Sequence, residues 1–322
     1  MPQLLPDGGA ATWRQVAPPP SPAPAREFGV PSIGFAHIKG TRHEARPGAI
    51  VDAQGPVGDR PFCFVDVERQ QVLKTVQNPR LIQIAASLSK GHGEGGEVGE
   101  EAGRLTMTLP DGRSASGVPH GVGERLTCDY WKRPVDLELT DGPHAQLASE
   151  WLDRPVRLAQ VPRGAVVYGA PLSLVTTASL RDLGARMAET RRAATDLVRE
   201  AARFRATVVI DTDEPYAEEA WAGRVLRLGE VRVRIGPPIP RCAVMDLDPI
   251  TGERNAPVLK TLAGFRPTNS AGEPVFGVYA EVIDTPANRT DAGDGGSATW
   301  CQVADQVSEP PSGSKEWATG VE

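Results

Sequence analysis

Short apolar segments separated by turn residues dominate the pattern of this chain. Within 33–38, 62–67, 207–210 and 275–282, and through the long stretch 225–235, apolar positions alternate with others or form compact runs. Such segments, bounded by Gly and Pro, are typical of strands. One region differs, because the apolar positions from about Ser179 to Arg203 recur close to every 3.6 residues, as in a helix. We therefore predict a mainly β (α+β) protein, a two-part β-barrel with one helical excursion at about 179–203.

The two ends of the chain differ from its middle. Residues 1–31 are rich in Pro and Ala, which favours an extended, disordered arm, and 287–322 are polar and Gly-rich, which favours a flexible tail. Between them we expect one β-barrel domain over 32–160 and a second over 161–286. Residues 7–17 nearly repeat as 294–304, with Trp13 and Trp300 in matching places. Two interpretations of this repeat are open. The plainer one is chance or a duplicated flexible tail, and the functional one is a short docking peptide anchored by Trp.

Charge and apolar content narrow the class of protein. The chain has 322 residues, 40% of them hydrophobic, and a net charge of −6, so we expect a real core and no nucleic-acid partner. No apolar run reaches the roughly 20 residues of a membrane span, and no basic leader precedes an apolar run near the start. We therefore expect a cytoplasmic protein with no membrane partner.

The cysteines carry the most informative chemistry. Cys63, Cys128, Cys242 and Cys301 are widely spaced with no C-x-x-C pair, which argues against a zinc knuckle, an iron–sulfur run or a disulfide framework. Cys242 follows the proline-stiffened segment 237–240 and is flanked by apolar strand-like residues, which predicts a rigidly held thiol. A thiolate suits soft or high-valent metals, whereas the alternative is a buried structural thiol.

The segment 204–266 resembles the MOSC domain of molybdenum-cofactor sulfurases. The resemblance rests on Phe204-Arg205, Glu218-Glu219-Ala220-Trp221, Pro240-Arg241-Cys242 and Asp248-Pro249. The upstream half resembles the β-barrel domain that precedes MOSC in the mitochondrial amidoxime-reducing component and its bacterial relatives, through Ile38-Lys39-Gly40 and Gly58-Asp59-Arg60. The chain is similar to those bacterial relatives that lack a ferredoxin module, and the resemblance covers roughly residues 33–283.

The resemblance implies a molybdenum cofactor (molybdopterin) and a site for it. In that family the matching cysteine, here Cys242, binds molybdenum beside the pterin dithiolene, which makes it both the metal ligand and the catalytic residue. The positions that match the family's cofactor-binding residues are Lys39, Arg60, Ser179, Arg205 and Thr207. In that family cationic side chains hold the cofactor's phosphate, and the matching positions are Lys39, Arg60 and Arg205. Without the resemblance, Lys39 and Arg60 alone would be interpreted as members of surface ion pairs; the family spacing favours the phosphate role. Thr207 replaces the Asn usual in the family, and Gly40 replaces a Ser, so two donors are altered.

The resemblance leaves three functions open. The first is an oxidoreductase that reduces small N-oxygenated substrates, with electrons from an external donor of the ferredoxin or flavin-reductase type. In this hypothesis Asp246 and Asp248 could shuttle protons, although Asp248 more simply opens an Asp-Pro turn. The second is a sulfur or cofactor carrier that uses Cys242. The third is a degenerate, non-catalytic MOSC binding module, which the altered Ala206-Thr207 pair favours. Pyridoxal-phosphate binding is associated with the family through the full sulfurases, but no segment here resembles their Lys-bearing domain.

Overall fold

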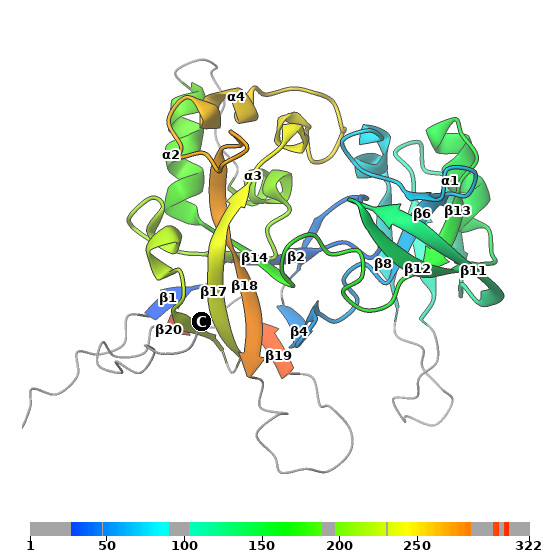
Figure 1. The fold of residues 1–322 in the computed structure, drawn as a ribbon, viewed down its shortest axis with the longest axis horizontal. Helices are drawn as coiled ribbons and strands as arrows, with labels where there is room; N and C mark the ends of the chain where they lie inside the picture. The colour runs from blue at the N-terminus through cyan, green and yellow to red at the C-terminus, as the bar shows by residue number, and fades with distance from the viewer. Residues whose placement is uncertain are drawn as a thin grey trace, which may run out of the picture.

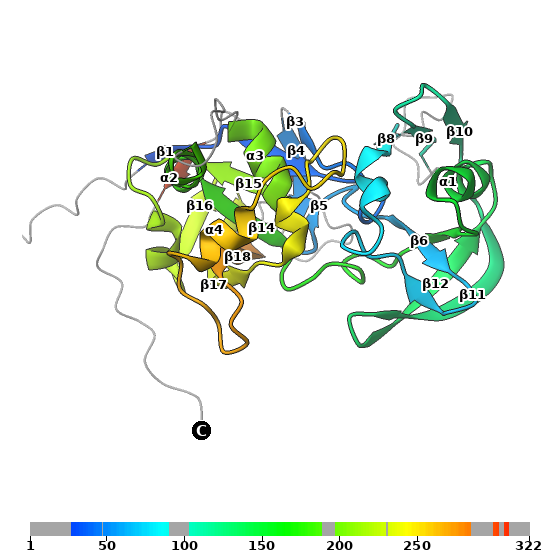
Figure 2. The same ribbon diagram turned by 90° about the horizontal axis from the view of Figure 1, so that it is seen from above.

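The computed structural model describes residues 27–46, 48–89, 103–188, 197–229, 231–284, 299–302 and 306–308. Two lobes lie side by side in the views of Figures 1 and 2, one built around a closed barrel and the other around a large sheet. Most of the Pro-rich arm lies outside the described residues.

The first lobe contains a closed five-stranded barrel. Its strands are, in order, β11 (Gly121–Tyr130), β12 (Arg133–Thr140), β13 (Arg157–Gln160), β6 (Phe62–Asp66) and β7 (Gln71–Val72). Every residue of β6 is buried, which explains why its sequence is a compact apolar run and not a strict alternation. The barrel interior is filled by side chains such as Cys63, Cys128 and Tyr130.

A smaller sheet and a helix complete this lobe. The sheet joins β10 (Ser114–Gly117), β9 (Leu105–Thr108) and β8 (Ala85–Leu88), and it follows a 3-10 helix at Pro79–Gln83. Helix α1 (His144–Leu152) contributes Ala148 to the core between this sheet and the outside of the barrel. The helix ends at Asp153, which takes the left-handed conformation with φ 53°.

The second lobe is organised by a nine-stranded sheet. Its order is β1 (Glu27–Gly29), β20 (Gln306–Ser308), β16 (Val225–Leu228), β17 (Val231–Pro240), β18 (Val275–Asp284), β14 (Leu172–Thr176), β15 (Val208–Ile210), β2 (Ser32–Phe35) and β3 (Glu44–Arg46). Because Val208 pairs with Ile33, the N-terminal strands continue a sheet whose centre comes from the second half of the chain.

Helices cover one side of the large sheet. They are α2 (Thr177–Ala188), α3 (Leu197–Phe204) and α4 (Val258–Ala263), with 3-10 helices at Ala217–Trp221 and Ala243–Asp246. Leu180 and Leu183 of α2 belong to one hydrophobic cluster with Phe204 of α3 and Phe276 of β18. The rings of Phe204 and Phe276 stack, with their centroids 4.4 Å apart. Among these described helices, none has the length and apolar character that crossing a membrane requires.

The fold class predicted from the sequence is confirmed: the protein is mainly β, contains a closed barrel and has few helices. The helical prediction at about 179–203 corresponds to α2 and α3, with 189–196 outside the described residues. The stretch 225–235 forms two antiparallel strands, because the chain reverses near Gly229 at φ 57°. The predicted domain boundaries stay a prediction.

A third, small sheet involves the end of the chain. It joins β19 (Thr299–Gln302), β4 (Gly48–Asp52) and β5 (Gly55–Pro56), and Trp300 of β19 pairs with Ile50. Apart from β19 and β20, the tail predicted at 287–322 lies outside the described residues, as does Trp13. The interpretation of the Trp repeat therefore stays a prediction.

Candidate functional site

Three basic side chains from distant parts of the chain meet between the lobes. Lys39 follows a parallel bridge between Ile38 and Phe62, which brings it next to Arg60. Arg205 comes directly after α3, and its Nη1 donates to the carbonyl oxygen of Thr41 at 2.7 Å. The electrostatic influence of Arg60 and Arg205 on Lys39 places all three in one cluster.

The backbone at this cluster is unusual. Arg60 and Arg205 both lie in the left-handed region, each with φ 52°, where residues other than Gly are uncommon. Gly40, directly after Lys39, has φ 87° and lies close to Thr75 and Leu81. Strained backbone of this kind persists where the surrounding structure holds it, and it is concentrated at functional sites.

A small enclosed space lies beside Arg60 and Arg205. It has a volume of about 50 Å³, and Ser173, Thr207 and Tyr279 also line it. By this measure one water needs roughly 10–15 Å³, so the space suits a group of a few heavy atoms. The Thr207 hydroxyl lies 3.2 Å from Ser173 Oγ, so the residue that replaces the family's Asn still presents a polar group to the pocket.

Positive charge exceeds negative charge in this cluster. Asp59 is the carboxylate that pairs with Arg60, with Arg60 Nε donating to Asp59 Oδ2 at 2.8 Å. Burial, then repulsion from Arg60 and Arg205, lowers the pKa of Lys39 to about 7. Burial, followed by repulsion from Arg60, also lowers the pKa of Arg205 to about 10. An anionic group placed among these side chains would relieve this repulsion.

A buried hydroxyl adds a second sign of an absent partner. Tyr130 Oη is buried and has no hydrogen-bond partner among the described residues. Lys39 Nζ lies 5.5 Å from the centroid of the Tyr130 ring, and Arg60 and Arg205 act on its electrostatics. Burial raises the pKa of Tyr130 to about 12, so the hydroxyl keeps its proton and remains a donor. A buried donor without an acceptor is rare and costly, which fits an acceptor-rich ligand at this place.

Cys242 lies two residues after the end of β17, with extended backbone, directly before the 3-10 helix Ala243–Asp246. The side chain is exposed, so the alternative of a buried structural thiol is wrong. Neighbouring Arg241 is buried and donates from Nε to the Phe276 carbonyl at 2.8 Å and from Nη1 to the Phe204 carbonyl at 3.2 Å. Arg241 therefore holds the backbone on which Cys242 is displayed.

Tyr279 links the thiol to the pocket. It lines the pocket with Arg205, and both Cys242 and Arg241 contribute to its electrostatics. Burial raises the pKa of Tyr279, so its hydroxyl stays protonated at neutral pH. In the part of the chain that the structure describes, no three His, Cys, Asp or Glu side chains gather as a metal site. A metal at Cys242 would therefore need further ligands from outside these side chains.

The predicted residues do not all lie together. Arg60, Arg205 and Thr207 line the pocket, and Lys39 lies within electrostatic range of both arginines. Ser179 instead is fully buried beside Glu218. Ser179 Oγ lies 3.0 Å from both Glu218 carboxylate oxygens and accepts the Tyr216 backbone N–H at 2.7 Å.

The two candidate proton shuttles have structural partners. Asp248 Oδ1 accepts the N–H groups of Ile250 and Thr251, which is the turn role expected from the sequence. Asp246 accepts the Leu259 backbone N–H at 2.8 Å and pairs with Arg254. Their bonds order the loops that follow Cys242.

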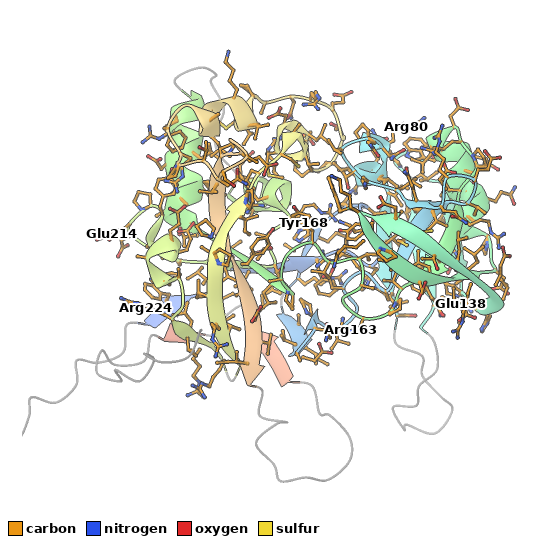
Figure 3. All side chains as sticks on the ribbon, viewed as in Figure 1. Arg80, Glu138, Arg163, Tyr168, Glu214 and Arg224 are labelled. Atoms are coloured by element: carbon orange, nitrogen blue, oxygen red, sulfur yellow. The ribbon has the colours of Figure 1, made fainter. Side chains whose placement is uncertain are left out.

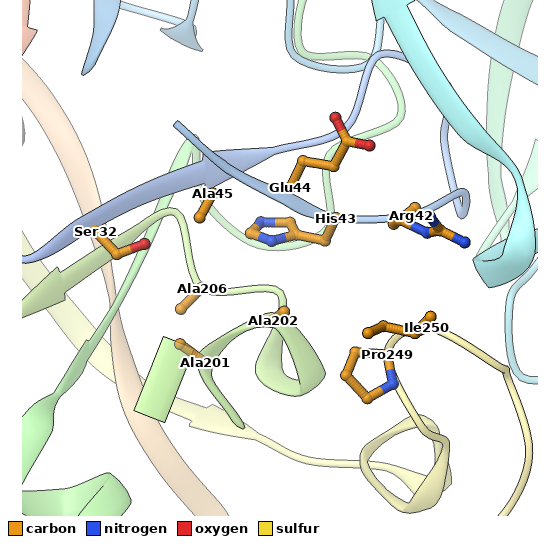
Figure 4. Close-up of a pocket in the computed structure, with 10 residues that line it drawn as sticks. All are labelled: Ser32, Arg42, His43, Glu44, Ala45, Ala201, Ala202, Ala206, Pro249 and Ile250. Carbon is orange, nitrogen blue, oxygen red and sulfur yellow. The ribbon is translucent and has the colours of Figure 1, made fainter. Parts of the chain in front are cut away.

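A larger cavity of about 430 Å³ adjoins the pocket (Figure 4). Ala201, Ala202 and Ile250 form part of its apolar lining. His43 contributes to the lining of both this cavity and the small pocket. Burial, followed by repulsion from Arg205 and Arg60, holds the pKa of His43 well below its usual range, so the ring is neutral.

Sequence reasoning missed Tyr130, His43, Ser173 and Tyr279. Each is an ordinary residue in or beside a strand, and only its tertiary neighbours give it a place at the site. Tyr130 did offer a signal, because it ends a strand and is buried there, and a buried Tyr hydroxyl normally needs a hydrogen-bond partner.

Fold and site together define a mainly β protein with a basic pocket between two lobes and an exposed thiol on an ordered turn. Residues 157–295 match the family described as the MOSC domain. The chain therefore contains a MOSC domain over these residues, as the resemblance predicted.

The curated relatives are molybdenum cofactor sulfurases. The protein from Anopheles gambiae is 26% identical over 257 residues, which is 73% of this chain and 31% of that protein. The protein from Oryza sativa subsp. japonica is 31% identical over 161 residues, 48% of this chain and 18% of that protein. The chain thus spans less than a third of the length of these relatives. A crystal structure of the YUAD protein from Bacillus subtilis aligns over 88% of this chain and 96% of that chain, with 7% identity and a TM-score of 0.36.

Proposed function

We propose that this protein binds the molybdenum cofactor and uses it to reduce N-oxygenated small molecules. The observation that carries the proposal is the surplus of basic side chains at the pocket: Lys39, Arg60 and Arg205 face one paired carboxylate, Asp59. The MOSC match and the relatives named molybdenum cofactor sulfurase support the same cofactor.

The donor set fits the cofactor's phosphate. Two guanidinium groups bind phosphate oxygens in bidentate fashion, and the Lys39 ammonium adds a compact charge. The Tyr130 hydroxyl, which has no partner among the described residues, would supply a further donor. The enclosed space of about 50 Å³ suits a phosphate group, while the rest of the cofactor would extend toward Cys242 along Tyr279.

When bound, the cofactor supplies two-electron oxygen-atom chemistry at molybdenum. The overall reaction is N–OH + 2e⁻ + 2H⁺ → N–H + H₂O, so each turnover needs an external reductant and two protons. We assign the electrons to a separate donor of the ferredoxin or flavin-reductase type, and the metal-ligand role to the exposed Cys242 thiolate. The chain's own contribution is binding, orientation and exclusion of water.

Tyr279 holds a proton near the reacting centre. Its raised pKa keeps Oη protonated, and its place in the pocket wall, within electrostatic range of Cys242, would let it donate a hydrogen bond to a substrate oxygen. Arg241 keeps this arrangement in place through its carbonyl contacts with Phe276 and Phe204.

The test is the molybdenum content of protein made in a host that synthesises the cofactor. We expect close to one molybdenum per chain in the wild type and a sharp loss in Cys242→Ser and in Arg60→Ala. Arg113→Ala is the matched control, because Arg113 is an exposed arginine that pairs with Asp111 and Glu150 on the barrel lobe. Negligible molybdenum in the wild type would contradict the proposal and favour the degenerate binding module.

A second function is favoured by the exposure of Cys242 and by the relatives' name, sulfurase. In a carrier, the Cys242 thiolate would attack the outer sulfur of a donor persulfide, forming Cys–S–S⁻ as the donor thiolate departs. Mass spectrometry after incubation with a persulfide donor separates the functions. A gain of one sulfur on Cys242 that passes to an acceptor, without any reduction of N-oxygenated compounds, would favour the carrier.

A further inference from the structure

The cavity of about 430 Å³ lies between helix α3, the residues that lead into strand β3, and the loop that carries Pro249 and Ile250. Figure 4 shows Ala202 on one side of this space, His43 on the opposite side and Pro249 below. A volume of this size is typical of small-molecule sites. Ile250 is 49% exposed, whereas most of the large apolar side chains in the described residues are buried. Three alanines, a proline and this exposed isoleucine thus make one side of the lining apolar.

Arg42 supplies the charge of this cavity. Its Nη2 donates to the Gln83 carbonyl oxygen at 3.0 Å, and its Nε is buried with no hydrogen-bond partner among the described residues. Within the same residues, no carboxylate pairs with Arg42. The carboxylate of Glu44 extends away from Pro249 in Figure 4 and lies 3.8 Å from Arg46 instead. The Arg42 guanidinium therefore keeps a positive charge and donors that the described residues do not use.

The wall that His43 forms carries a positive potential as well. Burial, followed by repulsion from Arg205, Arg60 and Arg46, holds the pKa of His43 well below its usual range. The imidazole is therefore neutral, and the same three guanidinium groups would attract an anion in the cavity. Because the facing wall is apolar, the favoured anion carries its charge at one end only.

Segments of both lobes enclose the cavity. Gln83 of the barrel lobe accepts from Arg42 and also donates from Nε2 to the Thr251 carbonyl oxygen at 2.5 Å. Gly252, with φ 70°, approaches the 3-10 helix of the barrel lobe so closely that a Cβ would lie 2.5 Å from a carbonyl oxygen of that helix. Arg80, labelled in Figure 3, belongs to the barrel lobe at this contact. These contacts order the loop, so the charged and apolar walls are placed without a ligand.

We propose that this cavity binds an amphipathic monocarboxylate. The carboxylate would accept from the Arg42 guanidinium, and a compact apolar body would pack on Ala202, Pro249 and Ile250. A cation would be repelled by Arg42, and a neutral molecule would leave its charge unpaired. A phosphate finds better partners in the small pocket, where arginines and hydroxyls are concentrated. This site needs neither the cofactor nor the Cys242 thiol, so it goes beyond the proposed function.

Isothermal titration of the full chain with octanoate tests the site, with 1-octanol and octylamine as ligands of similar size. We expect octanoate to bind about tenfold more tightly than octylamine. Arg42→Met should weaken octanoate binding about tenfold and leave 1-octanol binding within about twofold, and Arg42→Lys should restore part of the affinity. Ala202→Leu, which fills the cavity, should weaken both ligands about tenfold. Arg113→Met on the barrel lobe and Ala185→Leu on α2 change exposed residues and are the matched controls.

The outcomes separate this cavity from the small pocket. Lys39→Met should leave octanoate binding within about twofold, and inorganic phosphate should not displace octanoate. If phosphate displaces octanoate, or if Lys39→Met abolishes its binding, the carboxylate occupies the small pocket and the proposed site is wrong. No measurable octanoate binding by the wild type, equal affinity for octanoate and octylamine, or equal losses of octanoate and 1-octanol in Arg42→Met would also overturn it. None of these measurements involves molybdenum, so failure of the oxidoreductase function would leave this site standing.

Discussion

Replacing Lys39 by Met removes a cation that the folded protein holds at a cost. The pKa of Lys39 falls from 10.5 to about 7 on folding, first because of burial and then because of Arg60 and Arg205. Between these two pKa values the unfolded chain binds a proton that the folded chain has released. Unfolding therefore takes up a proton, and the stability of the wild type rises with pH in this window.

The size of the effect follows from the shift. For one group with pKa values of about 7 folded and 10.5 unfolded, the free energy of unfolding rises by about 2 kcal/mol from about pH 7 to about pH 9. Lys39→Met lacks this titrating group. Its free energy of unfolding should therefore rise by about 2 kcal/mol less than that of the wild type over the same pH range. Without a bound anion, the variant should also be the more stable protein at about pH 7.

Urea unfolding of cofactor-free protein at about pH 7 and pH 9 measures both effects. Lys260→Met, which removes an exposed lysine, is the matched control and should keep the wild-type dependence on pH. Phosphate should stabilise the wild type more at pH 7 than at pH 9, because it favours charged Lys39, and should stabilise Lys39→Met less. The same pH dependence in wild type and Lys39→Met would refute the reasoning.

Three further predictions concern single side chains. Tyr130→Phe deletes the buried hydroxyl without a partner; unfolding of cofactor-free protein should cost about 1 kcal/mol more, and phosphate should protect it less. Ser179→Ala deprives Glu218 of a donor; urea unfolding should show a loss of about 1–3 kcal/mol with phosphate protection unchanged, whereas lost protection would return Ser179 to the anion site. Phe276→Ala leaves a cavity against the stacked Phe204; thermal and urea unfolding should show a loss of about 3–5 kcal/mol, and a loss below 1 kcal/mol would contradict this packing.

The local pattern of apolar positions predicted where strands and helices lie better than it predicted which strands pair. The compact run at 62–67 became β6, and the alternation at 275–282 became part of β18. The helical period gave α2 and α3. The pairing of β2 with β15 joins residues about 175 positions apart, and no local pattern encodes such a contact because strand pairing depends on the whole chain.

The candidate site shows the same division. The family resemblance pointed to Lys39, Arg60 and Arg205, and the structure brings them together. It pointed equally to Ser179, which the structure instead bonds to the buried Glu218. A hydroxyl in a sequence carries no sign of which acceptor it will meet, since that depends on the packing of the 3-10 helix Ala217–Trp221 under α2.

The sequence by itself determined the mainly β class, the helical region and the presence of a thiol on a stiffened segment, because periodicity and proline act within a few residues. Tertiary structure decided that Cys242 is exposed, that Tyr130 lacks a partner among the described residues, and that Arg42 and Ile250 line one cavity. These properties depend on contacts between segments far apart in the chain. Burial, charge repulsion and pKa are properties of such surroundings, and they arise only when the two lobes assemble around the pocket.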